Sequence, residues 1–132
     1  MTRVRFLKFW SIAVGLMDVL TGLWLALSPA GVLRVLHIPL PSPDALVYLS
    51  WIGVLVMAVG LSYGFALGKR GQGEAVWMFT SLARILVAVF LTTRILDESM
   101  AKGWALVAVA DAVVAVVQIS VMRAGWWKEI HR

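Results

Sequence analysis

Three ionisable residues stand within long apolar stretches, and they are the side chains of this chain best suited to chemistry. Asp18, Arg84 and Asp111 are each flanked on both sides by mainly aliphatic residues. A charge at the centre of a bilayer costs about 2.5 to 3.5 kcal/mol on insertion scales unless it is paired or hydrated. Such residues either form a structural ion pair or take part in moving protons or solutes.

The three charges are expected to lie at one depth, because each stands a similar distance from the same end of its apolar stretch. We therefore predict a salt bridge from Arg84 to one or both aspartates, with Asp111 favoured because its stretch directly follows that of Arg84. An ion pair that fixes helix register is favoured. A proton relay or substrate site is the alternative, since two carboxylates and one guanidinium leave one negative charge uncompensated unless an aspartate is protonated or hydrated. Remaining hydrogen bonds could come from four polar residues: Gln118, Thr21, Thr80 and Ser81.

The composition places these charges in a membrane protein. Hydrophobic residues make up 61% of the 132 positions and charged residues 14%, which a soluble domain of this size could not shield from water. The net charge is +5, but the basic residues cluster at the ends of the apolar stretches, so lipid headgroups are expected as partners and nucleic acid is not. The absence of cysteine excludes disulfides, thiol redox chemistry and thiolate metal sites.

Four apolar stretches are long enough to cross a bilayer as helices, at about residues 9–28, 45–67, 75–93 and 103–122. Backbone groups in hydrocarbon must be satisfied internally, so we predict an all-α fold, with residues 1–132 forming one domain. Short connections predict an up-down-up-down four-helix bundle. The longer connection at 29–43 is expected to hold a short interfacial helix around 32–37. His37 is interpreted as an interfacial side chain, because no metal-ligand partner is suitably spaced.

The distribution of basic residues predicts the orientation of the four helices. Eight Lys and Arg residues fall at the segment ends that share the side of the termini, and three fall at the opposite ends. By the positive-inside rule, both termini are cytoplasmic. Aromatic residues near the segment ends are expected at headgroup level: Trp10, Trp51, Tyr63, Trp77 and Trp104.

Helical spacing indicates which faces of the segments point inward. Gly15 and Gly22 in the first segment, and Gly53, Gly60 and Gly64 in the second, recur at helical intervals and are expected to face other helices. Packing inside the monomer is favoured over dimerisation for the Gly60-x-x-x-Gly64 pair. The inward face of the third segment is predicted to contain Trp77, Ser81, Arg84, Ala88 and Leu91.

One part of the sequence resembles a known family. The motif consists of the run Ser28-Pro29-Ala30-Gly31-Val32-Leu33-Arg34-Val35-Leu36, followed by Pro39, Pro41 and Asp44 and then by a Gly-rich segment. This layout resembles the DoxX-like group of small four-helix bacterial membrane proteins. The resemblance implies a four-helix bundle in the bacterial inner membrane, with a role beside a redox partner, because some members are associated with quinone-linked oxidoreductases. It supplies no catalytic residue. The lack of cysteine and of paired intramembrane histidines argues against haem binding.

Three functions from different classes remain open. The leading hypothesis is an accessory or assembly subunit of a larger membrane complex, possessing no cofactor of its own and contacting other subunits or further copies of itself. The alternatives are a proton-coupled transporter or channel built on Asp18, Arg84 and Asp111, and a subunit of a quinone-linked oxidoreductase. Because the sequence contains no catalytic constellation, independent enzymatic activity is not expected.

Overall fold

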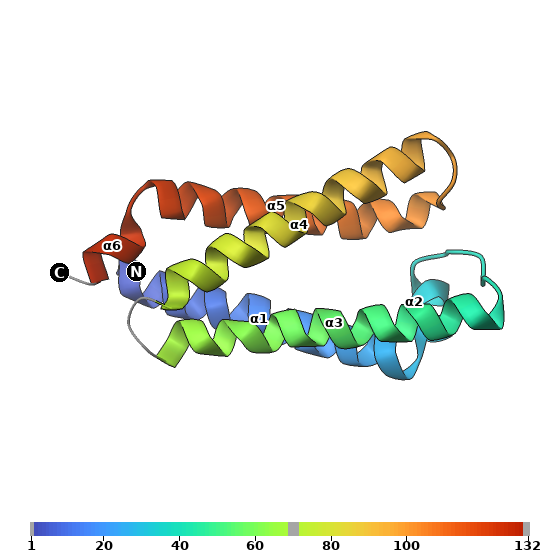
Figure 1. Ribbon diagram of the computed structural model, residues 1–132, viewed down its shortest axis with the longest axis horizontal. Helices are drawn as coiled ribbons and strands as arrows, with labels where there is room; N and C mark the ends of the chain where they lie inside the picture. Colours follow the sequence, from blue (N-terminus) through green and yellow to red (C-terminus); the bar gives the residue numbers. More distant parts are fainter. Residues whose placement is uncertain (1, 69–71, 131–132) are drawn as a thin grey trace.

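The computed structural model describes residues 2–68 and 72–130, and these residues form helices joined by short connections, with no strand among them (Figure 1). Four helical stretches are long and apolar enough to cross a membrane, the last of them spanning Lys102–Arg123. The elements in chain order are α1 (Arg3–Leu27), α2 (Pro29–Val35), α3 (Pro43–Gly68), α4 (Gln72–Leu96), the 3-10 turn η1 (Lys102–Trp104), α5 (Ala105–Arg123) and α6 (Trp126–Ile130).

The long helices extend beyond the apolar segments predicted from the sequence. α1 begins at Arg3 rather than near Phe9, and the side-chain oxygen of Thr2 accepts a hydrogen bond from the Arg5 backbone N–H at 3.3 Å. Flanking charges limit the apolar stretch but not the helix, because Lys and Arg are good helix formers. The α1 helix is therefore longer than its apolar stretch.

A short helix does occupy the first connection, although its bounds differ from the prediction. α2 runs from Pro29 to Val35, with proline in the first turn, where its missing N–H costs no hydrogen bond. Leu33 of this helix is buried, at 1% exposed. The helix ends before His37, whose positive φ of 57° turns the chain toward α3.

The long helices pack as two pairs. α1 packs along α3, and α4 packs along α5, while α4 also contacts α3. Figure 1 shows both chain ends at one end of the molecule, where the two pairs converge, and α2 at the other end, where the α4–α5 pair diverges from the α1–α3 pair. The pairs thus approach most closely near the termini.

The α1–α3 contact depends on glycine. A Cβ atom added to Gly22 would lie 2.5 Å from the Met57 backbone nitrogen, and one added to Gly60 would lie 2.6 Å from the Gly15 carbonyl oxygen. Gly53 faces the backbone of Ala26 in the same way, at 2.5 Å. These helices approach backbone to backbone, which only residues without side-chain bulk permit.

The expectation that Gly64 faces another helix is wrong. Gly64 is exposed, and a Cβ atom added to it would meet nothing within 4 Å. Its neighbour Tyr63 instead points into the bundle and is 1% exposed. One residue along a helix changes direction by about 100°, so the turn that presents Tyr63 inward turns Gly64 outward.

Two of the aromatic residues expected at headgroup level are buried in the core of the bundle. Trp77 is 0% exposed, and its indole nitrogen donates a hydrogen bond to Ser11 Oγ at 3.0 Å. Tyr63 is equally enclosed, and its hydroxyl is also hydrogen-bonded. The buried indole N–H of Trp77 and hydroxyl of Tyr63 are both satisfied, because each donates a hydrogen bond to a residue on another helix.

The core near the termini is closed by aromatic rings from α6. Trp127 is buried and packs edge-on against Trp77, with ring centroids 5.3 Å apart. Gly73 in the first turn of α4 leaves the space that the Trp127 ring occupies. On the other side, Trp126 packs edge-on against Phe6 of α1. The short α6 helix therefore connects α1 and α4 at this end.

Candidate functional site

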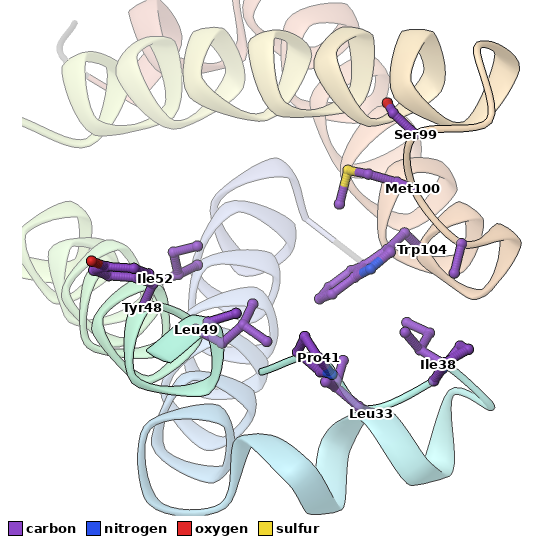
Figure 2. A pocket seen from close by; sticks show the side chains of 12 residues that line it. Leu33, Ile38, Pro41, Tyr48, Leu49, Ile52, Ser99, Met100 and Trp104 are labelled. Atoms are coloured by element: carbon purple, nitrogen blue, oxygen red, sulfur yellow. The ribbon is translucent and has the colours of Figure 1, made fainter. Parts of the chain in front are cut away.

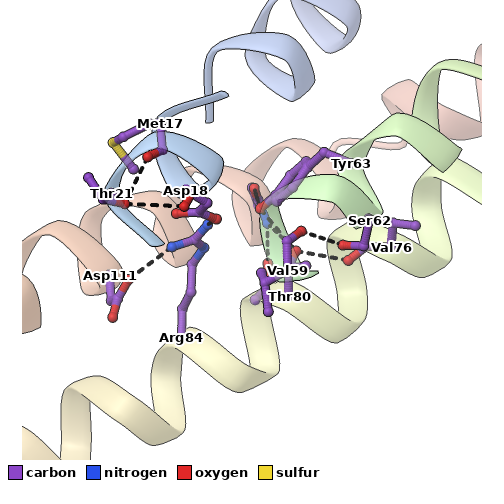
Figure 3. A network of polar contacts seen from close by, with 12 residues as sticks. Met17, Asp18, Thr21, Val59, Ser62, Tyr63, Val76, Thr80, Arg84 and Asp111 are labelled. Atoms are coloured by element: carbon purple, nitrogen blue, oxygen red, sulfur yellow. Dashed lines mark hydrogen bonds and ion pairs between the residues drawn. The ribbon is translucent and has the colours of Figure 1, made fainter. Parts of the chain in front are cut away.

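Arg84 connects three helices at the centre of the molecule. Its Nη1 atom donates a hydrogen bond to Asp111 Oδ1 on α5 at 2.9 Å, and its Nη2 atom donates to Asp18 Oδ2 on α1 (Figure 3). Arg84 is 6% exposed and Asp18 is 4% exposed. The predicted approach of Arg84 to a carboxylate is therefore present, but it is shared by both aspartates and does not favour Asp111.

This ion-pair cluster links the two helix pairs. α1 packs mainly on α3, and α5 packs mainly on α4. The guanidinium of Arg84, on the α4–α5 pair, directly contacts Asp18, on the α1–α3 pair. Charged hydrogen bonds with a guanidinium are stronger and more directional than neutral ones. The cluster therefore joins the two helix pairs at this level.

Within the described residues, the cluster has two carboxyl groups for one guanidinium. The Asp111 side chain keeps 17% of its surface exposed, compared with 6% for the Asp18 side chain. The Arg84 Nε atom is buried and has no hydrogen-bond partner there. Its guanidinium carbon lies 6.0 Å from the centroid of the Tyr63 ring, which favours the positive charge.

Gln118 organises a second, uncharged network next to the cluster. It is 0% exposed, and its Oε1 atom accepts hydrogen bonds from the Tyr63 hydroxyl at 2.6 Å and from Trp10 Nε1 at 3.1 Å. Its Nε2 atom donates to Ser81 Oγ at 2.9 Å and to Thr80 Oγ1 at 3.1 Å. Both ends of this buried amide are satisfied, so the network specifies how α1, α3, α4 and α5 face one another.

The polar residues expected to complete the charged cluster do not do so. The hydrogen bonds of Gln118 in the described part of the chain go to uncharged groups, and Thr80 donates to the Val76 carbonyl oxygen at 2.8 Å. Thr21 donates to the Met17 carbonyl oxygen of its own helix, also at 2.8 Å. A hydroxyl in a helix readily uses the carbonyl one turn earlier, and this local bond removes it from the cluster.

Sequence reasoning missed two members of the network, Trp10 and Tyr63. Aromatic residues near segment ends were interpreted as headgroup anchors. Tyr63 follows Gly60 by one helical turn, so helical spacing alone could have placed it on the inward face. The inward face predicted for α4 is correct: Trp77, Ser81, Arg84, Ala88 and Leu91 are all buried.

The arrangement defines a small helical bundle with a buried, largely hydrogen-bonded polar centre. Within residues 2–68 and 72–130, no three His, Asp or Glu side chains gather closely enough to hold a metal ion. A scan against protein-family models finds no match for the chain, and neither a curated protein nor a solved structure matches it.

Proposed function

We propose that the chain is an integral membrane protein whose four long helices cross the bilayer in up-down-up-down order, with α2 lying at the interface. The inside-out distribution of side chains supports this position. Large apolar residues are exposed on every long helix, including Leu20 at 56%, Phe65 at 64%, Phe79 at 65% and Val116 at 62%. The charged centre lies inside, so hydrocarbon is the solvent that suits this surface.

The proposed orientation places both termini in the cytoplasm of a bacterial inner membrane, and it predicts opposite exposure of the two ends. Thr2 and Asp97 are exposed residues at opposite ends of the bundle. Because the chain lacks natural cysteine, the variants Thr2→Cys and Asp97→Cys each carry a single cysteine. In intact spheroplasts, a membrane-impermeant maleimide should label the cysteine at 97 and not the cysteine at 2. Labelling of both from the same side would contradict the topology.

We infer that the protein acts as an accessory or assembly subunit of a larger membrane complex. The observation that carries this inference is an outer groove of about 320 Å³ between α4 and α5. Small residues line it, including Ala88, Ala108 and Ala112, and exposed Val89 and Val109 flank them. In a membrane, small residues allow a second helix to approach closely, so the groove suits a helix of another subunit.

Site-specific cross-linking tests the subunit role. A photo-cross-linking amino acid at Val89 or Val109 should yield one product of defined larger mass in cells, while the same residue at Phe65 on α3 should not. Phe65 is a matched control because it is exposed to a similar extent, at 64%. A product of twice 14.5 kDa would identify a second copy as the partner. A monodisperse protein without specific products from either valine would overturn the subunit role.

Proton-coupled transport is a second candidate, and one observation favours it. The cluster holds two carboxyl groups for one guanidinium, and Asp111 keeps part of its side chain exposed. A carboxylate in this setting is suited to exchanging a proton. The DoxX-like resemblance and the link to quinone-linked oxidoreductases stay predictions, because no matched protein supports them.

A further inference from the structure

An apolar cavity lies at the end of the molecule opposite the termini, where the two helix pairs diverge. Its volume is about 410 Å³, within the range of roughly 300 to 1,000 Å³ that is usual for small-molecule sites. One wall comes from α2, residues 38–41 and the start of α3, and the other from residues 99–104. Figure 2 shows the Trp104 ring and Met100 projecting toward Leu49 and Pro41.

A close contact between two connections keeps these walls together. A Cβ atom added to Gly103 would lie 2.5 Å from the Leu36 carbonyl oxygen and 2.6 Å from Ile38 Cγ1. Leu33 and Ile38, which line the cavity, are otherwise buried, at 1% and 8% exposed. The connection after α4 thus packs directly against the segment after α2. This contact fixes the two walls of the cavity relative to each other.

The cavity is continuous with the apolar outer surface of α3. Tyr48 and Ile52 line it and are also 61% and 47% exposed. The hydroxyl of Ser99, a polar group in the lining, already donates to Asp97 and lies 3.3 Å from the Arg94 carbonyl oxygen. Ordered water requires two to four polar partners, and an unfilled void loses dispersion contacts, so hydrocarbon is the favoured content.

The charges near this cavity balance one another. The segments that form it, and the residues next to them, carry three cationic and three anionic side chains: Arg34, Arg94, Lys102, Asp44, Asp97 and Glu98. Arg94 and Asp97 pair at 3.6 Å, and hydrogen bonds donated by Ser99 lower the pKa of the Asp97 carboxyl, which keeps it charged. An anionic headgroup gains no net attraction from such a set, in contrast to the basic end near the termini.

We propose that this cavity binds one acyl chain of a bilayer phospholipid whose headgroup carries no net charge. The apolar lining, the opening along α3 and the balanced charges support this ligand. The inference rests on the membrane position proposed above. The bound chain fills the space between the diverging helix pairs and packs against Trp104 and Met100.

Photolabelling in nanodiscs tests the site. The full chain is placed in phosphatidylcholine nanodiscs that contain phosphatidylcholine with a diazirine on one acyl chain, and cross-links are mapped by mass spectrometry. Labelling of Met100 and Trp104 should saturate as the analogue fraction rises. Ala45→Phe and Ala101→Phe, which add bulk from opposite walls, should abolish that labelling, whereas Ala110→Phe at an exposed position of α5 should preserve it.

The outcomes separate this inference from the membrane proposal. Cross-links on exposed Phe90 and Val109 without any in the cavity would overturn the acyl-chain site and leave the membrane position intact. Absence of cross-links along the whole chain would overturn both. Competition by unlabelled phosphatidylglycerol that equals or exceeds competition by unlabelled phosphatidylcholine would overturn the assignment of an uncharged headgroup, and weaker competition would support it. Cavity labelling that persists in both phenylalanine variants would also overturn the site.

Discussion

Replacing Arg84 with methionine is expected to lower the free energy of unfolding by about 3 to 5 kcal/mol, because two carboxylates in the interior then lose their counter-charge. Unfolding with increasing sodium dodecyl sulfate in mixed micelles measures this quantity. The triple variant Asp18→Asn, Arg84→Met, Asp111→Asn should recover most of the loss, since it removes the buried charges together.

A matched arginine on the same helix serves as the control. The Arg94 side chain is 49% exposed and pairs with Asp97 at 3.6 Å near the end of α4. Arg94→Met should change the free energy of unfolding by no more than about 0.5 kcal/mol, because exposed ion pairs contribute little. An effect of Arg84→Met within that same range would show that the ion-pair cluster does not hold the helix pairs together.

The triple variant also separates the two candidate roles of the cluster. If Arg84 and the aspartates only fix the register of the helices, the folded triple variant should keep the cross-linked product formed through Val109. If the cluster exchanges protons, the triple variant should fold but lose proton flux, measured with a pH-sensitive dye inside proteoliposomes. Flux by the wild-type chain that disappears in the folded variant would favour the transporter.

The second large effect is expected at the α1–α3 contact. Gly60→Leu should lower the free energy of unfolding by about 1 to 3 kcal/mol or more, because its side chain must enter space occupied by backbone. A Cβ atom at this position already lies 2.6 Å from both the Gly15 carbonyl oxygen and the Val19 nitrogen. Thermal unfolding in mild detergent, followed by circular dichroism, provides the measurement.

Gly64→Leu makes the same change one turn further along α3 and is the matched control. Because Gly64 faces open space, this variant should be neutral or slightly stabilising, since leucine is a better helix former than glycine by up to about 1 kcal/mol. Equal destabilisation by both variants would mean that the loss reflects the added leucine and not the close contact of α1 with α3.

The sequence by itself determined the long helices and the position of each charge along its helix. Four apolar stretches of sufficient length predict four long helices, because helix length and apolar length both follow from consecutive residues. The position of Arg84 along its helix likewise follows from counting residues, as does that of Asp18. Their common level in the bundle was therefore predictable, and their contact required only that the helices face each other.

The tertiary structure decided the direction in which each side chain points and the partners that it reaches. Sequence spacing placed Gly64 on the inward face of α3, and Tyr63 was interpreted as a headgroup residue. The structure turns Gly64 outward and buries Tyr63, because the rotation of α3 about its axis is set by its contacts with α1 and α4. The sharing of Arg84 between Asp18 and Asp111 depends on distances across three helices. The order of residues in the sequence fixes the position of a side chain along its helix. The packing of the helices fixes the rotation of each helix about its axis and the distance between helices, and a hydrogen bond forms only where all of these bring donor and acceptor together.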